Sequence, residues 1–237
     1  MDHSFPTQQS FSDSETSTVE SNTEVETRVS QKESPPDSAI LYHNAGTLRR
    51  CFTKIPALLI TLFLELIPAL VYSSGYSLLE PYIGREKSNL FIALNALVAA
   101  VAGNFALQNS SNMSRAISMK IITKHKWASH AWKEFLVGCA LSIELGVLFF
   151  IITGFILCPI LFHGQVDPTF GGVLGLVFLV STTIGSFSGL ITPPVLYFGL
   201  GLDPSACAGP GETCFQDVVG SVVMVYLAQG VFSLSKR

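Results

Sequence analysis

Charged residues are scarce in this sequence. Only 13% of its 237 residues are charged and 49% are hydrophobic, whereas an ordinary soluble domain carries about 25% charge. The charge is also unevenly distributed: residues 1–40 hold eight acids and two bases, and residues 41–237 hold nine acids and twelve bases. The body of the chain is therefore more apolar than a soluble protein, and no nucleic acid is expected among its partners.

Catalytic motifs are missing as well. The sequence contains no HExxH, no GxSxG and no GxxxxGK[ST], the short patterns that would indicate a zinc protease, a serine hydrolase or a nucleotide-binding loop. Its five cysteines show no CxxC spacing and read as small hydrophobic residues rather than as a disulfide or zinc framework: Cys51, Cys139, Cys158, Cys207 and Cys214. We therefore expect neither an enzyme nor a bound cofactor.

The first forty residues lack the apolar content of a folded domain. They are rich in Ser, Thr, Glu and Pro, and their few hydrophobic residues follow no period. Such a segment cannot bury enough surface to offset the entropy lost on ordering. Residues 1–40 are accordingly predicted to be a disordered acidic tail on the cytoplasmic side, and residues 41–237 to form the membrane domain.

Long hydrophobic runs are what the rest of the chain has in abundance. A bilayer core of about 30 Å needs about 20 apolar residues in a helix. Five segments meet this requirement: 55–79, 89–113, 135–161, a stretch within 169–202, and 213–232. The expected fold class is an all-α integral membrane protein with five transmembrane helices, embedded in the lipid bilayer.

Basic residues predict the orientation of these spans. They cluster before the first span and between the second and third, at Arg49, Arg50, Lys54, Arg115, Lys120, Lys124, Lys126 and Lys133. Cytoplasmic links carry the excess of Lys and Arg in membrane proteins. The N-terminus is therefore predicted to be cytoplasmic and, after five crossings, the C-terminus to lie on the opposite side.

Small residues and prolines predict how the spans pack. Two rows of small residues, four apart, allow close contact between helices: Gly138, Ser142 and Gly146, and Ser181, Gly185 and Gly189. Pro193-Pro194 should break or kink the fourth span. Asp203-Pro204 resembles a helix cap followed by proline at the first helical position, which predicts a short or re-entrant helix before Gly209-Pro210.

A polar stripe descends the second span. Asn104, Gln108, Ser111 and Arg115 fall at i, i+4, i+7 and i+11, which places them on one side of a helix. Such groups either form hydrogen bonds between helices, each contributing about 0.6–2 kcal/mol, or line a polar path. The alignment of several polar groups that ends in a cation favours the path.

Asp217, inside the fifth span, is the sharpest signal. An acid within a span costs about 2.5–3.5 kcal/mol to insert and suggests a functional site. Thr213, Gly220 and Ser221 share its helix face, so its surroundings offer oxygen ligands of the kind that Mg²⁺ and Ca²⁺ prefer. The alternative is that Asp217 caps a helix near the membrane surface.

Two other acids lie within spans. Glu144, in the third span, could line a cavity or form a hydrogen bond with a neighbour, and it is a secondary candidate together with Arg115. Glu65, in the first span, has no evident partner in the sequence and is expected to face solvent or a second copy of the chain.

Five segments together resemble one known family. "AGNFALQNSSNMSRAI" resembles the GGNxGxQSxTxxVRxL signature of the membrane domain of MgtE-type magnesium transporters, and "LGLDPSACAGPGETCFQDVVG" resembles that family's LxxDPAxxSxPxxTxxxDxxG ending. "KIPALLI", "LLEPYI" and "HAWKEFLVGCALSIELGVL" are similar to shorter motifs at the ends of its first span and the start of its third. The resemblance runs in order from about residue 53 to 232.

The resemblance implies a function and a set of site residues. Family members form homodimers with a cation pathway at the subunit interface, lined largely by the second and fifth spans. By position, Asp217 corresponds to the acid that holds hydrated Mg²⁺ and Asn104 to a pore-side asparagine. The other implied pore-lining positions are Gly103, Gln108, Thr213, Gly220 and Ser221, and Mg²⁺ or another divalent cation is the implied cargo.

The chain departs from the family pattern in three places of the second span. Ala102 and Ala106 stand where the family has glycine, and Asn109 stands where it has serine. The two added methyl groups are expected to narrow a close helix contact. The soluble sensor modules of bacterial members have no counterpart in the forty residues of the tail.

Two alternatives to a transporter stay open at this point. One is a membrane scaffold that kept the fold without transporting. The other is an intramembrane aspartyl protease, which needs two carboxylates in one site, whereas only Asp217 lies clearly inside a span.

Overall fold

The computed structural model describes residues 44–201 and 210–235. The acidic tail and the helix expected after Asp203 therefore lie outside the described residues. The chain divides into two compact units, Met1–Ile55 and Pro56–Arg237. In the first unit, the Arg50 Nε donates a hydrogen bond of 2.8 Å to the Ala45 carbonyl oxygen where helix α3 begins.

The described residues form helices and contain no β-strand. Five helical segments are long and apolar enough to cross a membrane, which confirms the predicted fold class. They are α3 (Thr47–Ile83); α4 (Arg85–Ser118); α5 (Trp127–Ile151) continued by the π-helical η1 (Ile152–Leu157) and by α6 (Cys158–Leu161); α7 (Pro168–Pro194) continued by the π-helical η2 (Val195–Gly199); and α9 (Pro210–Ser235).

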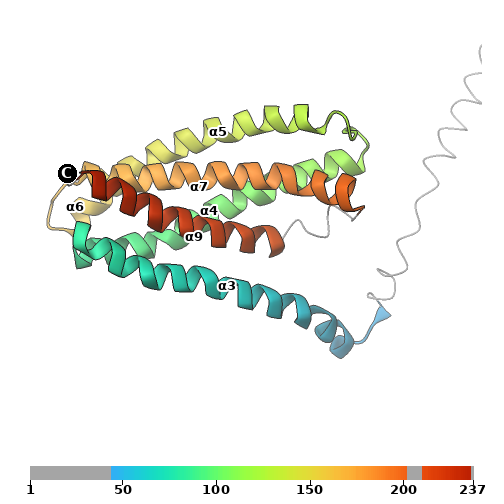
Figure 1. Ribbon diagram of the computed structural model, residues 1–237, viewed down its shortest axis with the longest axis horizontal. Coiled ribbons are helices and arrows are strands. Elements are labelled where there is room, and N and C mark those ends of the chain that lie inside the picture. The colour runs from blue at the N-terminus through green and yellow to red at the C-terminus, as the bar shows by residue number, and fades with distance from the viewer. Residues whose placement is uncertain (1–43, 202–209, 236–237) are drawn as a thin grey trace, which may run out of the picture. The chain divides into compact units, whose positions relative to one another are not determined.

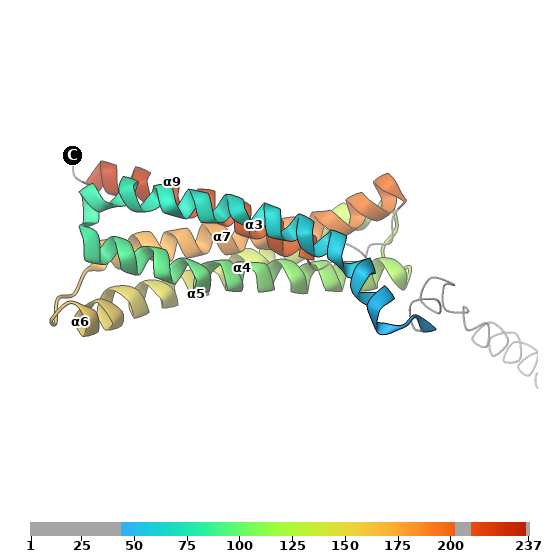
Figure 2. The ribbon, with the colours of Figure 1, turned by 90° about the horizontal axis from the view of Figure 1, so that it is seen from below.

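Successive spans of the unit from Pro56 onward run in opposite directions (Figures 1 and 2). The α3–α4 turn, the link from α6 to α7 and the C-terminal end of α9 lie at one end, and the α4–α5 link lies at the other. A single residue, Gly84, joins α3 to α4 with φ +79°. This left-handed backbone favours glycine because a side chain would clash there.

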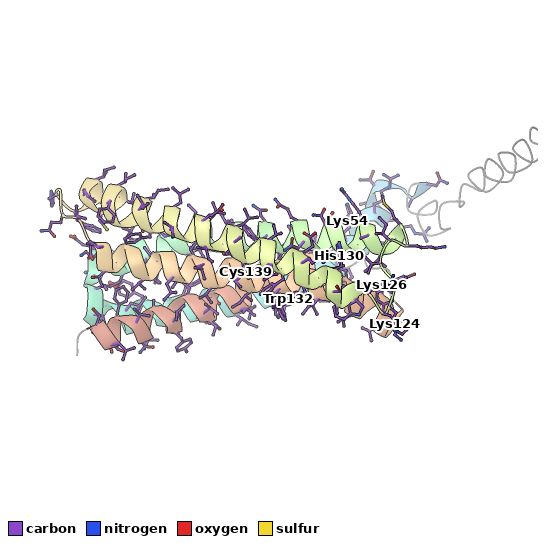
Figure 3. The ribbon with its side chains drawn as sticks, turned by 90° about the horizontal axis from the view of Figure 1, so that it is seen from above. Lys54, Lys124, Lys126, His130, Trp132 and Cys139 are labelled. Atoms are coloured by element: carbon purple, nitrogen blue, oxygen red, sulfur yellow. The ribbon has the colours of Figure 1, made fainter. Side chains whose placement is uncertain are left out.

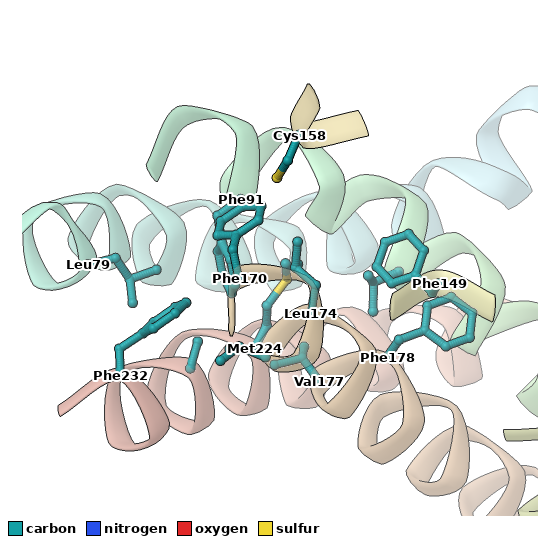
Figure 4. Close-up of a cluster of buried hydrophobic side chains, with 13 residues drawn as sticks. Leu79, Phe91, Phe149, Cys158, Phe170, Leu174, Val177, Phe178, Met224 and Phe232 are labelled. Atoms are coloured by element: carbon teal, nitrogen blue, oxygen red, sulfur yellow. The ribbon is translucent and has the colours of Figure 1, made fainter. Parts of the chain in front are cut away.

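Helix α7 is the central helix of the bundle and packs against α4, α5 and α9. Its Phe170 meets the Phe91 ring of α4 edge to face, with centroids 6.4 Å apart, in the cluster shown in Figure 4. A second apolar cluster, which includes Met113, Ile117 and Leu190, lies near the α4–α5 link. The hydrophobic core of the bundle is thus divided into two clusters.

The predicted rows of small residues lie where helices approach closely. Gly138 of α5 faces Ser186 of α7. A Cβ at Gly185 of α7 would lie 2.5 Å from the Ala102 carbonyl oxygen of α4, and Gly189 meets Ala106 one turn further along. Close contact at these places is possible only because the side chains are absent or minimal.

The fourth span stays helical through Pro193-Pro194, so of the two expected outcomes, a break or a kink, the break does not occur. Both prolines are buried and helical, and the chain continues as the π-helical η2 to Gly199. The φ angle of proline is compatible with a helix. The cost of proline inside the span is therefore the loss of backbone hydrogen-bond donors. A π-helical turn accommodates such a change in hydrogen bonding.

An ion pair holds α4 to the start of α7. Lys87 donates to the Asp167 carboxylate, and the Phe170 N–H donates to the same carboxylate at 2.9 Å, so Asp167 also caps α7. Burial acts to raise the pKa of Asp167, but the bonds from Lys87 and Phe170 outweigh it and lower the pKa below its ordinary value. The stabilisation is full above the unfolded pKa of about 3.9 and is lost as the pH falls through the lower folded value.

Replacing Asp167 should separate these two roles. Asp167→Asn keeps a capping oxygen and removes the charge. As the pH falls below about 4, the stability of this variant should therefore decrease less than that of the native chain. Asp167→Ala removes both and should cost a further ~0.5–2 kcal/mol at neutral pH, the usual value of an N-cap. Thermal unfolding in detergent between pH 3 and 7 measures both effects. Equal stability of the two variants at neutral pH would show that the cap contributes nothing.

Candidate cation site

A cavity that contains several polar groups lies among three helices of the bundle. It has a volume of about 520 Å³ and is walled by α3, α4 and α9. Its lining residues are Glu65, Pro68, Tyr72, Asn95, Ala96, Ala99, Ala100, Gly103, Asn104, Leu107, Thr213 and Asp217. In chain position they fall near the middle of α3 and α4 and in the first two turns of α9.

Helix α4 provides the space for the cavity. Ala96, Ala99, Ala100 and Gly103 line it and recur at spacings of three and four, which keeps them on one face of the helix. Their small side chains leave room for a hydrated ion or a ligand. Asn104 lines the same cavity at the edge of this face and is exposed, as the polar stripe predicts.

Helix α9 contributes Asp217 and Thr213, one helical turn apart, to the opposite wall. Asp217 is half-buried. It lies in the second turn of a helix that begins at Pro210, beyond the positions from which a side chain caps a helix. The hypothesis that Asp217 faces the same space as Asn104 therefore agrees with the fold.

Helix α3 supplies the residue that the sequence left without a partner. Glu65 lines the cavity together with Asp217, and the two carboxyl groups are neighbours there. The buried thiol of Cys214 is a further neighbour of Glu65. Glu65 therefore shares this cavity with Asp217 of its own chain.

Two more polar groups of the cavity were not singled out from the sequence. Asn95 of α4 is only 6% exposed, although it is an amide within a span. The Tyr72 hydroxyl of α3 lies beside Asn95 and Ser221, yet it is buried without a hydrogen-bond partner among the described residues. No pattern within one helix identifies these residues, because they belong to α3 and α4 and share a cavity only where α3 lies beside α4 and α9.

The other predicted site residues lie outside the cavity lining. Gln108 and Arg115 are exposed and Ser111 is half-buried on α4. Gly220 and Ser221 are buried in α9, where the Ser221 hydroxyl donates to the Val218 carbonyl oxygen at 2.7 Å. Glu144 is exposed on α5, a helix that does not line this cavity.

The three departures from the family pattern face away from the cavity, toward α7. Ala102 and Ala106 are fully buried, and their carbonyl groups meet Gly185 and Gly189. The Asn109 Nδ2 donates to the Ser186 hydroxyl at 2.8 Å. The added methyl groups therefore occupy a contact between helices and leave the cavity wall unchanged.

The donor set of the cavity consists of oxygen groups. Two carboxylates, two amides, a phenol and the Thr213 hydroxyl belong to its lining. Within the described residues, no group of three or more His, Cys, Asp and Glu side chains is placed to hold a metal ion. The arrangement suits a hard divalent cation that keeps part of its water shell.

Comparison with known proteins agrees with this chemistry. No curated protein matches the chain. The family model of MgtE, described as a divalent cation transporter, matches residues 95–227, which begin at Asn95 of the cavity and include Asp217. This match covers more than half of the 237 residues, and the chain therefore belongs to the MgtE family of divalent cation transporters.

Proposed function

We propose that this membrane protein transports Mg²⁺ through a pore at the interface of a homodimer, lined by α4 and α9. The observation that carries the proposal is the shared cavity of Asn104 and Asp217. A carboxylate concentrates the cation, and amide and hydroxyl oxygens accept hydrogen bonds from its water shell. Mg²⁺ loses its water reluctantly and is usually held by one or two carboxylates together with water.

The membrane potential is sufficient to drive such transport. A charge moving through 100 mV changes in energy by about 2.3 kcal/mol, so a divalent ion gains about 4.6 kcal/mol on entering a cell. No covalent chemistry is required, in keeping with a transporter family.

The exposed polar face of α4 supports the dimer. At 100° per residue, Asn104 lies about a quarter turn and Gln108 about a third of a turn from the small-residue face, and both are exposed. Amides on the outside of a span are costly in lipid. A second copy with its own stripe would cover them and place two Asp217 carboxylates near one axis.

The proposal is tested by flux in proteoliposomes that hold the full chain. Mg²⁺ entry reported by a trapped dye is expected, with competition by Mn²⁺ and Ca²⁺ as the measure of selectivity. Gln108→Cys should crosslink two copies, and Leu148→Cys, exposed on α5, serves as the control position. Absence of Mg²⁺ flux from a correctly inserted dimer would favour the alternative, a membrane scaffold that does not transport.

We further propose that the α4–α5 link faces the cytoplasm. Its Lys124 and Lys126 lie at the end of the bundle where α4 meets α5 (Figure 3), and they are exposed. Labelling of single cysteines should place residue 124 and the N-terminus on one side and residue 237 on the other. Both termini on one side would contradict this orientation.

The neighbouring carboxylates also meet the requirement stated for an aspartyl protease. A protease needs a water molecule between two carboxyl groups and a cleft for an extended peptide. The match to a transporter family favours cation binding at the same pair. Cleavage of a membrane substrate that is lost in Glu65→Gln, without any cation flux, would reverse this preference.

A further inference from the structure

We propose that Glu65 is a second cation-binding residue, which together with Asp217 gives each protomer its own paired-carboxylate site for a divalent cation. The inference rests on the proposed function, in which Asp217 alone binds the ion. It adds the first span to the cation path, whereas the sequence indicated only the second and fifth.

The geometry places both acids in one space. Glu65 and Asp217 come from α3 and α9, more than 150 positions apart in the chain, and line the same cavity. The two carboxyl groups are neighbours within it. None of the cavity's lining residues, all of them described above, is Lys, Arg or His.

Charge balance then calls for a cation. Two half-buried carboxylates in contact repel each other strongly where water is limited. Buried charges in proteins are ordinarily paired or bound to metals. With no basic side chain in the lining, a proton shared by the two groups or a bound cation relieves this repulsion, and only a divalent cation compensates both charges at once.

A second, independent feature indicates a ligand in this cavity. The Tyr72 hydroxyl oxygen is buried and unpartnered, beside an Asn95 side chain that is 94% buried and lines the same space. Such groups are normally satisfied. The water shell of an ion held by Glu65 and Asp217 would provide the missing partner of the Tyr72 hydroxyl.

Pro68 leaves one backbone oxygen of α3 without its helical donor, next to Glu65 in the chain. Pro68 lines the cavity and lies inside the helix, and its ring nitrogen cannot donate to the carbonyl four residues earlier. That carbonyl belongs to Leu64, next to Glu65. A backbone oxygen without its helical donor is tolerated in a span where it adjoins a polar space, and carbonyl oxygens are ligands for hard cations.

The experiment compares binding with transport in the full-length chain. Binding of Mn²⁺, with competition by Mg²⁺, is measured on the detergent-purified chain by electron paramagnetic resonance, and Mg²⁺ flux is measured in proteoliposomes. Glu65→Gln is expected to weaken Mn²⁺ binding at least tenfold and to lower flux. Glu86→Gln, an exposed acid at the start of α4, is the matched control and should change neither.

Coupling between the two acids gives a readout that a purely structural role would not produce. If they share one ion, Asp217→Asn combined with Glu65→Gln should weaken Mn²⁺ binding much less than the product of the two single effects. Native-like Mn²⁺ binding by Glu65→Gln, while Asp217→Asn binds poorly, would overturn the inference and leave the proposed function intact. Paired-site binding without Mg²⁺ flux in the native chain would instead refute the proposed function.

A second variant covers the case in which Glu65→Gln fails to assemble. Glu65→Asp keeps the charge and withdraws it by one methylene. Because Mg²⁺ demands shorter and more regular ligand geometry than Ca²⁺, the ratio of Mg²⁺ to Ca²⁺ competition against Mn²⁺ should fall severalfold. If Glu65→Asp leaves both the Mg²⁺ to Ca²⁺ competition ratio and the Mn²⁺ affinity unchanged, the inference is overturned.

Discussion

Asp217→Asn is expected to reduce Mg²⁺ flux at least tenfold while leaving the protein folded. The amide has nearly the same volume as the carboxylate, so packing in the second turn of α9 is retained. What is lost is the charge that concentrates the cation in the cavity. A lost contact to a desolvated charge costs about 2–5 kcal/mol, and 1.4 kcal/mol is already a factor of ten in affinity.

The measurement is flux in liposomes at matched protein levels, with insertion and dimerisation checked by crosslinking. Asn104→Ala should reduce flux less, because a neutral oxygen binds a cation more weakly than a charged one. Glu86→Gln, outside the cavity, should transport normally. Full transport by a correctly assembled Asp217→Asn would show that Asp217 does not bind the transported cation. The polar stripe of α4 would then be explained by helix packing.

The sequence was sufficient to predict the spans and to single out Asn104 and Asp217, which line one cavity. Bilayer thickness fixes helix length, so five apolar runs had to become five helices. Asp217 and Asn104 were found because a polar group inside a span is costly and therefore conspicuous. Both signals are local properties of a single helix.

The rest of the site depends on how helices face one another. Glu65 was noticed as an acid in a span, but its partner is more than 150 positions away, and periodicity within one helix cannot identify it. Asn95 was not singled out because its neighbours in the α4 sequence are mostly apolar. The polar stripe was placed correctly on one side of α4, but that side only borders the cavity, whose wall is the row of small residues from Ala96 to Gly103.

The contact of α4 with α7 explains why the departures from the family pattern are compatible with the site. Ala102 and Ala106 carry methyl groups where the family has hydrogen atoms, and both face α7 rather than the cavity. The glycines on the facing helix, Gly185 and Gly189, leave space for the α4 backbone. The position of Asn104, which lies between the two alanines in sequence, therefore depends on α7 having no side chain at these places.

Gly189→Ala should consequently be among the most destabilising single changes in the bundle. The new Cβ would lie 2.9 Å from the Ala106 carbonyl carbon and Cα, closer than real Cβ atoms approach, and nearer still to its oxygen. Because the obstacle is helix backbone, no rotamer change relieves the clash. Overpacking of this kind costs about 1–3 kcal/mol or more, which in a chain of this size corresponds to a fall in Tm of roughly 2–12 °C.

Gly172→Ala on the same helix is the matched control. A Cβ there meets nothing within 4 Å, and alanine favours a helix over glycine by up to about 1 kcal/mol, so its Tm should be unchanged or slightly higher. Gly189→Ala should also transport less per inserted dimer, because the displaced α4 carries Gly103 and Asn104 with it. Equal Tm and equal flux in the two variants would show that α4 and α7 are not held at this distance, and the position of the cavity wall would then need another cause.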